Sequence, residues 1–203
     1  MREGRIPSRR AGTDDAVLSA VLQSSPRRVL DAGCGEGWLS RRIAQEGVEV
    51  VGFDGSQPLI ERATATGGAE FMQLSYHDFI SNPRRFDEFD VIVFNFSLFT
   101  ADIVSILRAA RDTVRESGKL VIQTVHPFND AADHPYQDAW RVEDFATMGA
   151  DFATSMPWYF RTMSSWINST LEAGWVIDEL REPLNQGTGK PLSLIVISHH
   201  ANR

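Results

Sequence analysis

The chain lacks most of the features that mark secreted and membrane proteins. It has one cysteine, Cys34, so no internal disulfide can form and nothing points to an oxidising compartment. No run approaches the roughly 18 apolar residues that a membrane helix needs. The first 25 residues are polar and arginine-rich, without the apolar core of a signal peptide. We therefore expect a cytoplasmic protein with no membrane partner.

Positive charge is also scarce. The 203 residues have a net charge of −7 and a pI of about 5.2, and lysine occurs only at Lys119 and Lys190. Nucleic acids bind basic surfaces, so an acidic chain predicts no nucleic-acid partner. A chain of this length is one domain in size. We expect residues 1–203 to form a single domain, with 1–12 as an N-terminal arm.

Short β-branched segments alternate with helical patterns along most of the chain. This order predicts a Rossmann-like α/β fold, with a doubly wound sheet of seven strands and helices on both faces. Turn residues separate the last two strands, so the last strand should be antiparallel. Strands are expected at 28–31, 48–53, 70–74, 89–95, 119–125, 175–180 and 192–198. Helices are expected between Thr13, as the N-cap, and Pro26, and at 38–46, 57–64, 102–116 and 162–173.

The strongest chemical signal is the segment Asp31-Ala-Gly33-Cys34-Gly35-Glu36-Gly37-Trp38. It lies between an expected strand and an expected helix, where glycines let the backbone turn tightly and approach a ligand. Asp54 stands 23 residues after Asp31, at the end of the second strand. An acid at that place accepts hydrogen bonds from ribose hydroxyls. The ligand should therefore contain an adenosine-like ribose.

The spacing of the glycines separates two kinds of cofactor. A nicotinamide or flavin fingerprint needs G-x-G-x-x-G, and the bulky Trp38 occupies the position of its third glycine. A NAD-dependent oxidoreductase is therefore disfavoured. Within the loop, we interpret Cys34 as a small packing residue rather than as a reactive thiol.

The chain resembles the class I S-adenosylmethionine-dependent methyltransferases in VLDAGCGEGWLSRRIA and VVGFDGS, their motif I and following acidic motif. Two further segments, FDVIVFNFSLF and ESGKLVIQTVHP, resemble the fourth and fifth strands of that family. The segment WYFRTMSSWINSTLEAGWVIDELREP resembles the last helix and sixth strand of the small-molecule members of that family, such as the ubiquinone-biosynthesis group. The resemblance covers residues 13–199 and implies S-adenosyl-L-methionine as the cofactor.

The resemblance also implies which residues bind the cofactor. The glycines would form the loop, Asp54 would bind the ribose, and the segment after the third strand would edge the adenine. Many relatives have an Asp where this chain has Ser75, so Asp78 would substitute from three residues on. Arg10, or Arg9, could donate to the methionine carboxylate. The expected cofactor-binding set is Asp31, Gly33, Gly35, Gly37, Asp54, Ser56, Ser75, Tyr76, Asp78, Asn95, Phe96 and Arg10.

An aromatic and acidic segment follows the fifth strand. Residues 126–168 contain nine of the 20 aromatic residues and have a formal charge of −4. We expect 126–161 to be a lid insertion over the acceptor, bound by Trp140, Trp158, Tyr159 and Arg161. The alternatives are a second small core or a homodimer contact. Arg161 would either hold an anionic acceptor or cap local carboxylates.

The expected function is methyl transfer from S-adenosyl-L-methionine to a small-molecule acceptor, at an oxygen or nitrogen atom rather than carbon. His126 follows the fifth strand, so it is either a general base or a loop histidine that orients the next proline. It has potential metal ligands nearby in Asp130, Asp133 and His134, but no period brings them together, and we expect no metal. The alternative function is a non-catalytic, S-adenosylmethionine-binding regulatory module.

Overall fold

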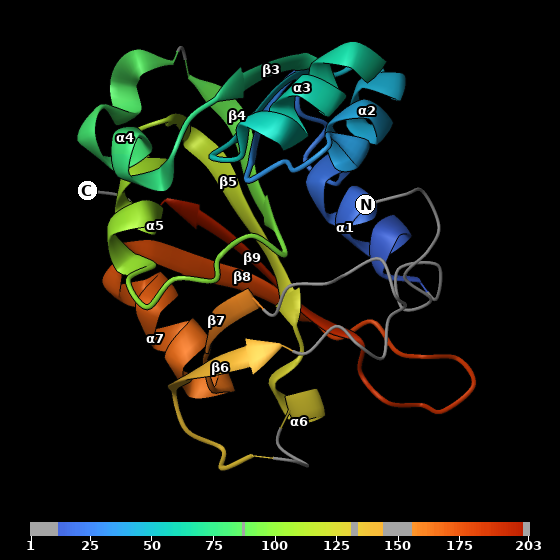
Figure 1. Ribbon diagram of the computed structural model, residues 1–203, viewed down its shortest axis with the longest axis vertical. Coiled ribbons are helices and arrows are strands. Elements are labelled where there is room, and N and C mark those ends of the chain that lie inside the picture. Colours follow the sequence, from blue (N-terminus) through green and yellow to red (C-terminus); the bar gives the residue numbers. More distant parts are fainter. Residues whose placement is uncertain (1–11, 87, 131–133, 144–155, 201–203) are drawn as a thin grey trace.

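A computed structural model describes residues 12–86, 88–130, 134–143 and 156–200 of the chain. Its main element is a seven-stranded sheet in the order β3-β2-β1-β4-β5-β9-β8, with β9 antiparallel to both of its neighbours (Figure 1). The expected Rossmann-like sheet with an antiparallel last strand is therefore confirmed. The strands are β1 (Arg28–Ala32), β2 (Glu49–Asp54), β3 (Glu70–Gln73), β4 (Phe89–Asn95), β5 (Val114–Val125), β8 (Trp175–Arg181) and β9 (Ser193–His200).

Helices cover both faces of the sheet, as the alternation of apolar residues requires. On β1, Val29 belongs to the core under α1 and α2, and the next residue, Leu30, belongs to the core under α4, α5 and α7. Both side chains are fully buried. The helices are α1 (Asp14–Leu22), α2 (Trp38–Gln45), α3 (Gln57–Thr66), α4 (Tyr76–Ser81), α5 (Val104–Arg111) and α7 (Met163–Glu172). None of the helices in the described part of the chain is long and apolar enough to span a membrane.

The parallel strands β1, β2 and β4 end at the same edge of the sheet. Asp31 is paired with Gly52 on one side and with Val93 on the other. The segments that follow these strands are therefore neighbours, although they are far apart in sequence. This edge is where open α/β sheets bind ligands.

Two helix predictions differ from the structure. The expected helix 102–116 ends at Arg111, because Thr113 turns its hydroxyl back onto the Ala109 and Ala110 carbonyls. Val114, expected on a helix face, instead pairs with Phe89 as the first residue of β5. At α1, Thr13 makes no side-chain cap; its carbonyl instead accepts a hydrogen bond from Gln123 Nε2 at 3.1 Å.

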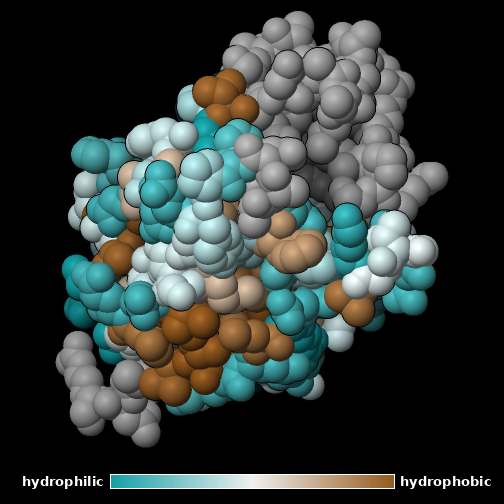
Figure 2. All heavy atoms as spheres, turned by 90° about the horizontal axis from the view of Figure 1, so that it is seen from below, coloured by the Kyte–Doolittle hydropathy of each residue, from teal (hydrophilic) through white to brown (hydrophobic). Residues whose placement is uncertain are grey.

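The segment after β5 contains structure that the sequence did not predict. It forms the short helix α6 (Pro127–Asp130) and an antiparallel hairpin of β6 (Ala139–Glu143) and β7 (Met156–Phe160). The hairpin lies at the bottom of Figure 1, apart from the seven-stranded sheet. Seen from that end, the surface is mostly hydrophilic, and hydrophobic residues gather in one area (Figure 2).

Trp175, the first residue of β8, provides a test of the core under α4, α5 and α7. Trp175 is 1% exposed and donates from Nε1 to the Leu107 carbonyl at 2.9 Å. We expect Trp175→Ala to lower the free energy of unfolding by about 3–5 kcal/mol, measured by urea denaturation with circular dichroism. Trp140→Ala is the matched control, because Trp140 is 59% exposed and its loss should cost less than about 1 kcal/mol. Equal losses in the two variants would contradict this description of the core.

Candidate functional site

The loop after β1 has a backbone that requires its glycines. Gly33, Gly35 and Gly37 all have positive φ, at 75°, 58° and 79°. Two of them also lack space for a side chain. A Cβ on Gly33 would lie 2.4 Å from the Ser97 Cβ, and one on Gly37 would lie 2.5 Å from the Phe71 ring. The loop can therefore approach its neighbours, and a ligand, with bare backbone.

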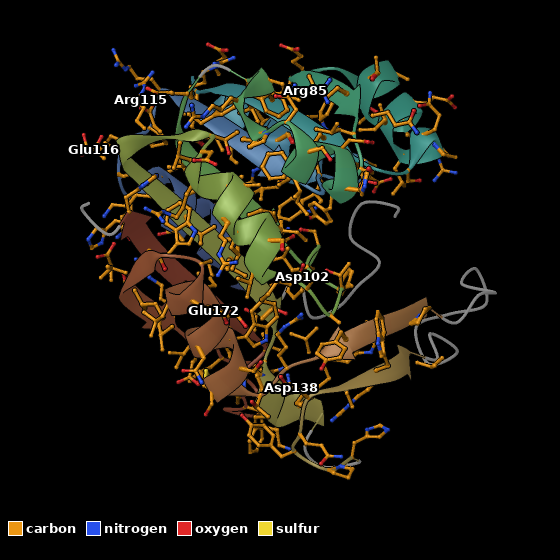
Figure 3. The ribbon with its side chains drawn as sticks, turned by 90° about the vertical axis from the view of Figure 1, so that its left-hand side faces the viewer. Arg85, Asp102, Arg115, Glu116, Asp138 and Glu172 are labelled. Atoms are coloured by element: carbon orange, nitrogen blue, oxygen red, sulfur yellow. The ribbon has the colours of Figure 1, made fainter. Side chains whose placement is uncertain are left out.

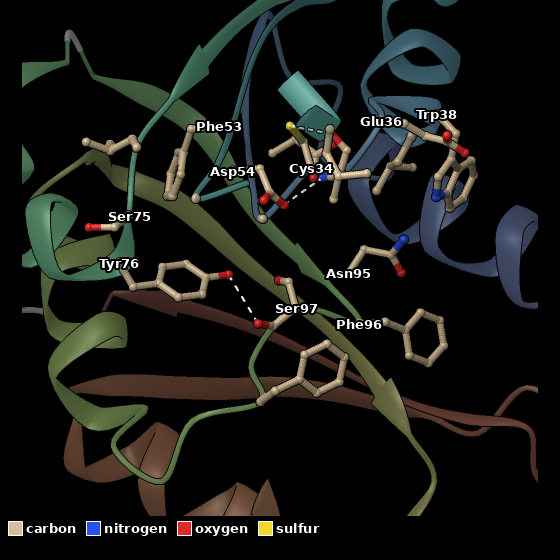
Figure 4. A pocket seen from close by; sticks show the side chains of 18 residues that line it. Cys34, Glu36, Trp38, Phe53, Asp54, Ser75, Tyr76, Asn95, Phe96 and Ser97 are labelled. Carbon is tan, nitrogen blue, oxygen red and sulfur yellow. Dashed lines mark hydrogen bonds between the residues drawn. The ribbon is translucent and has the colours of Figure 1, made fainter. Parts of the chain in front are cut away.

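The end of β2 holds this loop in place. The Phe53 carbonyl accepts hydrogen bonds from the Gly33 and Cys34 amides at 2.8 and 2.9 Å. The Asp54 carboxylate accepts from the Gly35 amide through Oδ2 at 3.0 Å, and from the Ser56 amide through Oδ1 at 2.8 Å (Figure 4). Each carboxylate oxygen can accept more than one hydrogen bond, so Asp54 retains acceptor capacity toward a ligand.

Asp31 is buried at the base of the loop. Its carboxylate is 1% exposed and accepts a hydrogen bond from Ser40 Oγ at 2.6 Å. Burial raises the pKa of Asp31 to about 6. The charged carboxylate at neutral pH is therefore poorly solvated, and a cationic ligand group could stabilise it in place of water.

Cys34 behaves as a packing residue. Its side chain is 6% exposed and lies against Gly52, where an added Cβ would be 3.0 Å from Sγ. Burial raises the pKa of the Cys34 thiol well above its usual range, so the thiolate needed for nucleophilic chemistry is disfavoured.

The segment after β3 forms the capped helix α4. Ser75 is its N-cap, accepting from the Asp78 amide at 3.1 Å and donating from Oγ to Asp78 Oδ2 at 2.7 Å. The hydrogen bond from Ser75 lowers the pKa of Asp78. Ser75 lines the cavity beside Asp54, and Asp78 does not. Asp78 therefore reaches the cavity only through its hydrogen bond with Ser75, and its role toward the adenine stays a prediction.

Tyr76 lines the cavity and also contacts the backbone beside the glycine loop. Its hydroxyl lies 3.3 Å from the Ala32 carbonyl and 3.4 Å from the Ser97 carbonyl. Burial raises the pKa of Tyr76 above its usual range. The ring therefore supports the glycine loop from below as well as lining the cavity (Figure 4).

The end of β4 contributes the residues opposite the glycine loop. Phe96 has a positive φ of 49°, which is uncommon for a bulky residue, and its amide donates to the Gln123 carbonyl. Ser97 Oγ donates to the Ala32 carbonyl at 2.8 Å. The Oδ1 atom of Asn95 is buried without a hydrogen-bond partner. A buried, unsatisfied acceptor at a cavity wall is suited to a ligand donor.

These segments enclose a cavity of about 440 Å³. Eight of the expected cofactor residues line it: Asp31, Gly33, Gly35, Asp54, Ser75, Tyr76, Asn95 and Phe96. Gly37, Ser56 and Asp78 lie outside its lining, and Arg10 lies outside the described residues. Ten lining residues are not in the expected cofactor-binding set: Cys34, Glu36, Trp38, Leu39, Phe53, Gly55, Leu59, Leu74, Ser97 and Phe99. Most of them are adjacent in sequence to one of the recognised motifs, and this adjacency could have identified them as lining residues.

His126 does not have the arrangement expected of a general base. Its Nδ1 accepts from the Phe128 amide at 3.1 Å, and its Nε2 lies 2.6 Å from Glu182 Oε1. Both ring nitrogens are thus engaged, and His126 does not line the cavity. The residue instead ties the start of α6 to the segment after β8. Within the described part of the chain, no three His, Cys, Asp or Glu side chains gather as a metal site.

The β6–β7 hairpin presents two different faces. On one face, Trp140 pairs with Tyr159, their ring centroids are 5.5 Å apart, and Trp140 is 59% exposed. On the other, Phe160 is buried, with the Arg141 guanidinium 3.7 Å above its ring and Trp158 at its edge. The expected acceptor residues therefore divide between an open face and a packed face.

Arg161 is placed differently from both alternatives drawn from the sequence. It is 2% exposed, and its Nη2 donates to the backbone carbonyls of Thr100 and Ala101. These partners are carbonyls rather than carboxylates or a bound anion. Arg161 does not line the cavity, but it holds the loop that follows the cavity-lining Phe99.

Comparison with known proteins is consistent with this geometry. The methyltransferase domain family matches residues 8–173 of the chain. A tRNA1(Val) (adenine(37)-N6)-methyltransferase of Yersinia pseudotuberculosis is 33% identical over 129 residues, which cover 57% of this chain and 49% of that protein. A Yersinia pestis protein of the same name is 34% identical over 124 residues. The chain thus spans about half the length of these curated relatives.

Solved structures share the fold over nearly the whole chain. An S-adenosylmethionine dependent methyltransferase from Mesorhizobium loti has a TM-score of 0.71 at 21% identity, covering 94% of this chain and 98% of its own. Magnesium protoporphyrin IX methyltransferase from Synechocystis, solved with bound S-adenosylmethionine, has a TM-score of 0.63 at 14% identity. It matches over 95% of this chain and 80% of its own.

One expectation from the sequence is wrong. A small-molecule acceptor and no nucleic-acid partner were expected, but the curated relatives are named for their action on tRNA. The absence of a nucleic-acid partner was inferred from the net charge of −7, which sums over the whole chain and does not describe the surface around one site. The small-molecule acceptor was inferred from the resemblance to the small-molecule methyltransferases.

The identity of the family rests on three findings that agree. The glycine loop and Asp54 have the geometry of a cofactor site, the sheet order and the solved structures give the fold, and the family match covers most of the chain. Neither a NAD-dependent oxidoreductase nor a non-catalytic module is supported by them. The chain belongs to the methyltransferase domain family.

Proposed function

We propose that the chain transfers the methyl group of S-adenosylmethionine to an amino nitrogen of a nucleic-acid base. The observation that carries this proposal is the buried, unsatisfied Oδ1 of Asn95, which lines the same cavity as Asp54. The relatives named above, which methylate N6 of an adenine in tRNA, support the choice of acceptor.

The cavity fits the cofactor at both of its ends. Asp54 would bind the ribose hydroxyls with the carboxylate that the Gly35 and Ser56 amides hold in place. Asp31 would face the methionine ammonium, which would solvate its buried charge. When bound, the cofactor supplies an electrophilic methyl group on its sulfonium, so the protein mainly has to align the acceptor.

Asn95 would provide that alignment. Its Oδ1 would accept a hydrogen bond from an acceptor N–H, which fixes the position of the nitrogen and leaves its electrons directed at the methyl group. An oxygen acceptor without a proton would leave the buried carbonyl oxygen unsatisfied, at a cost of roughly 1–3 kcal/mol. The open aromatic face of the hairpin, with Trp140 and Tyr159, would stack a planar base.

Removal of the Asp54 carboxylate tests the cofactor site. We expect Asp54→Ala to weaken S-adenosylhomocysteine binding on the order of 100-fold by isothermal titration calorimetry, because charge-assisted hydrogen bonds to the ribose are lost. Asp54→Asn keeps one acceptor oxygen and should lose less. Glu61→Gln, on the exposed face of α3, is the control and should bind as the wild type does. Unchanged binding in a folded Asp54→Ala variant would refute the ribose assignment.

Asp31 predicts a pH dependence of both stability and binding. Its pKa of about 6 lies above the ordinary 3.8. Its ionisation therefore costs stability above pH 6, by about 3 kcal/mol, and this cost is relieved as the pH falls from 6 toward 4. A bound ammonium favours the ionised form, so cofactor affinity should fall by up to about tenfold per pH unit below 6.

Asp31→Asn is the variant that isolates this ionisation. The amide oxygen can still accept from Ser40 Oγ, so the fold should be retained. Calorimetry of S-adenosylhomocysteine binding from pH 5 to 7.5 should show a flat profile for Asp31→Asn and a sloping one for the wild type. Parallel slopes would assign the pH dependence to another group.

The acceptor is tested with unmodified tRNA transcripts and methyl-labelled cofactor. We expect label in RNA, sensitive to ribonuclease and recovered as a base methylated on its amino nitrogen by mass spectrometry. Asn95→Leu should lower kcat by roughly 100-fold, with S-adenosylhomocysteine affinity within about threefold of the wild type. If the cofactor binds but neither RNA nor isolated nucleosides are labelled, the nucleic-acid acceptor is excluded while the cofactor assignment stands.

A further inference from the structure

The β6–β7 hairpin is joined to the loop after β4 by three hydrogen bonds. The Tyr159 amide, on the outer edge of β7, donates to the Phe99 carbonyl at 2.9 Å. Arg161 Nη2 donates to the Ala101 carbonyl at 2.7 Å and also to the Thr100 carbonyl. Three consecutive carbonyls of the loop are therefore bound by one short segment of the hairpin.

The opposite end of the same loop is bound to the cofactor site. Asn95, Phe96, Ser97 and Phe99 line the cavity, and Ser97 Oγ donates to the carbonyl of Ala32, the residue before the glycine loop. The loop is thus held by the glycine loop at one end and by Arg161 at the other. The contacts form a continuous connection from the glycine loop to the hairpin.

Arg161 is an expensive residue for a purely structural link. It is 2% exposed, burial lowers its pKa, and its Nη1 atom has no hydrogen-bond partner. Its guanidinium lies 4.8 Å from the Tyr159 ring centroid and 5.2 Å from that of Trp166. An apolar side chain would fill the space between those rings without the cost of burying a charge.

The acids nearest to this guanidinium are engaged elsewhere. Asp102 binds the Ser105 amide at 3.0 Å through Oδ1, and Asp138 binds the Thr162 amide at 2.9 Å through Oδ1. Both carboxylates therefore stabilise the starts of helices α5 and α7, and they lie on the same side of the molecule in Figure 3. Among the described residues, neither comes within salt-bridge distance of Arg161, whose guanidinium donates its hydrogen bonds to the loop carbonyls.

We propose that Arg161 is a positioning residue that couples the hairpin to the loop after β4, so that cofactor binding orders the surface on which the acceptor is bound. This inference rests on the proposed function, because it requires cofactor in the cavity and acceptor on the hairpin. Arg161 contacts neither of them. It acts through the Thr100 and Ala101 carbonyls and through the Tyr159 ring.

The experiment measures hydrogen exchange of β7 with and without S-adenosylhomocysteine. In the wild-type chain, saturating ligand should slow exchange severalfold in peptides that contain Pro157–Phe160. In Arg161→Leu this protection should be lost, while the dissociation constant of S-adenosylhomocysteine changes less than about threefold. Arg161→Lys keeps a charged donor for the two carbonyls and should retain part of the protection.

A control and a kinetic readout separate coupling from a loss of structure. Arg108→Leu removes an exposed arginine that links α5 to Glu172 on α7, and it should leave the protection unchanged. With labelled cofactor and tRNA transcripts, Arg161→Leu should lower kcat or raise the acceptor KM at least tenfold without changing the cofactor KM, and Arg161→Lys should partly restore the value.

Failure of this inference is distinguishable from failure of the proposed function. If S-adenosylhomocysteine does not bind the wild-type chain, the proposed function fails at its cofactor step. If it binds and β7 is not protected, or is protected equally in Arg161→Leu, the coupling is overturned and the cofactor assignment stands. The β7 amides of Arg161→Leu could already exchange fully without ligand, and Arg161→Lys then decides the question. Ligand-induced protection of β7 in Arg161→Lys supports the coupling. Loss of S-adenosylhomocysteine affinity in Arg161→Lys overturns it.

Discussion

The geometry of the site depends on the hydrogen bonds by which the end of β2 holds the loop after β1. The Phe53 carbonyl and the Asp54 carboxylate together accept from the amides of Gly33, Cys34 and Gly35. Glycine loses more conformational entropy on folding than any other residue, so a loop with three glycines is costly to order. The hydrogen bonds from β2 offset this cost. The same residue lines the cavity, so the group that orders the loop also belongs to the wall of the candidate site.

Buried polar groups around the cavity are a cost that the hydrophobic core has to offset. Asp31 is charged at neutral pH with little solvation, Asn95 Oδ1 is unsatisfied, and Arg161 is buried among aromatic rings. Each of these would be cheaper as an apolar residue of similar volume. The three residues lie next to the glycine loop, at the end of β4 and beside the hairpin, respectively. Unfavourable groups of this kind are concentrated where ligands and moving segments are bound.

The sequence predicted those parts of the fold that local patterns control. β4 was predicted at its observed bounds, because a continuous apolar run buried on both faces has no competing period. The glycine loop and Asp54 were predicted because their function requires particular residue types at particular spacings. α5 was predicted too long because Val114 suits a helix face and a strand equally well, and only its pairing with Phe89 decides between them.

Contacts between residues far apart in sequence explain most of what the sequence could not predict about the site. Ser75 and Asp78 are a local exception: they are three residues apart, and their mutual hydrogen bonds cap helix α4. His126 is next to the expected strand end, but Glu182, 56 residues later, determines its orientation. Arg161 is adjacent to the aromatic segment in sequence, and its partners are backbone carbonyls, which no residue pattern marks.

The hairpin is a further place where residues close in sequence have different surroundings. Its aromatic residues were counted together as a lid, but strand alternation places Trp140 and Tyr159 on one face and Trp158 and Phe160 on the other. A single open aromatic face selects for a planar group and carries no information on the size of the molecule to which that group is attached. The net charge of the chain carries none either, because it sums over the whole chain and does not describe the surface around one site.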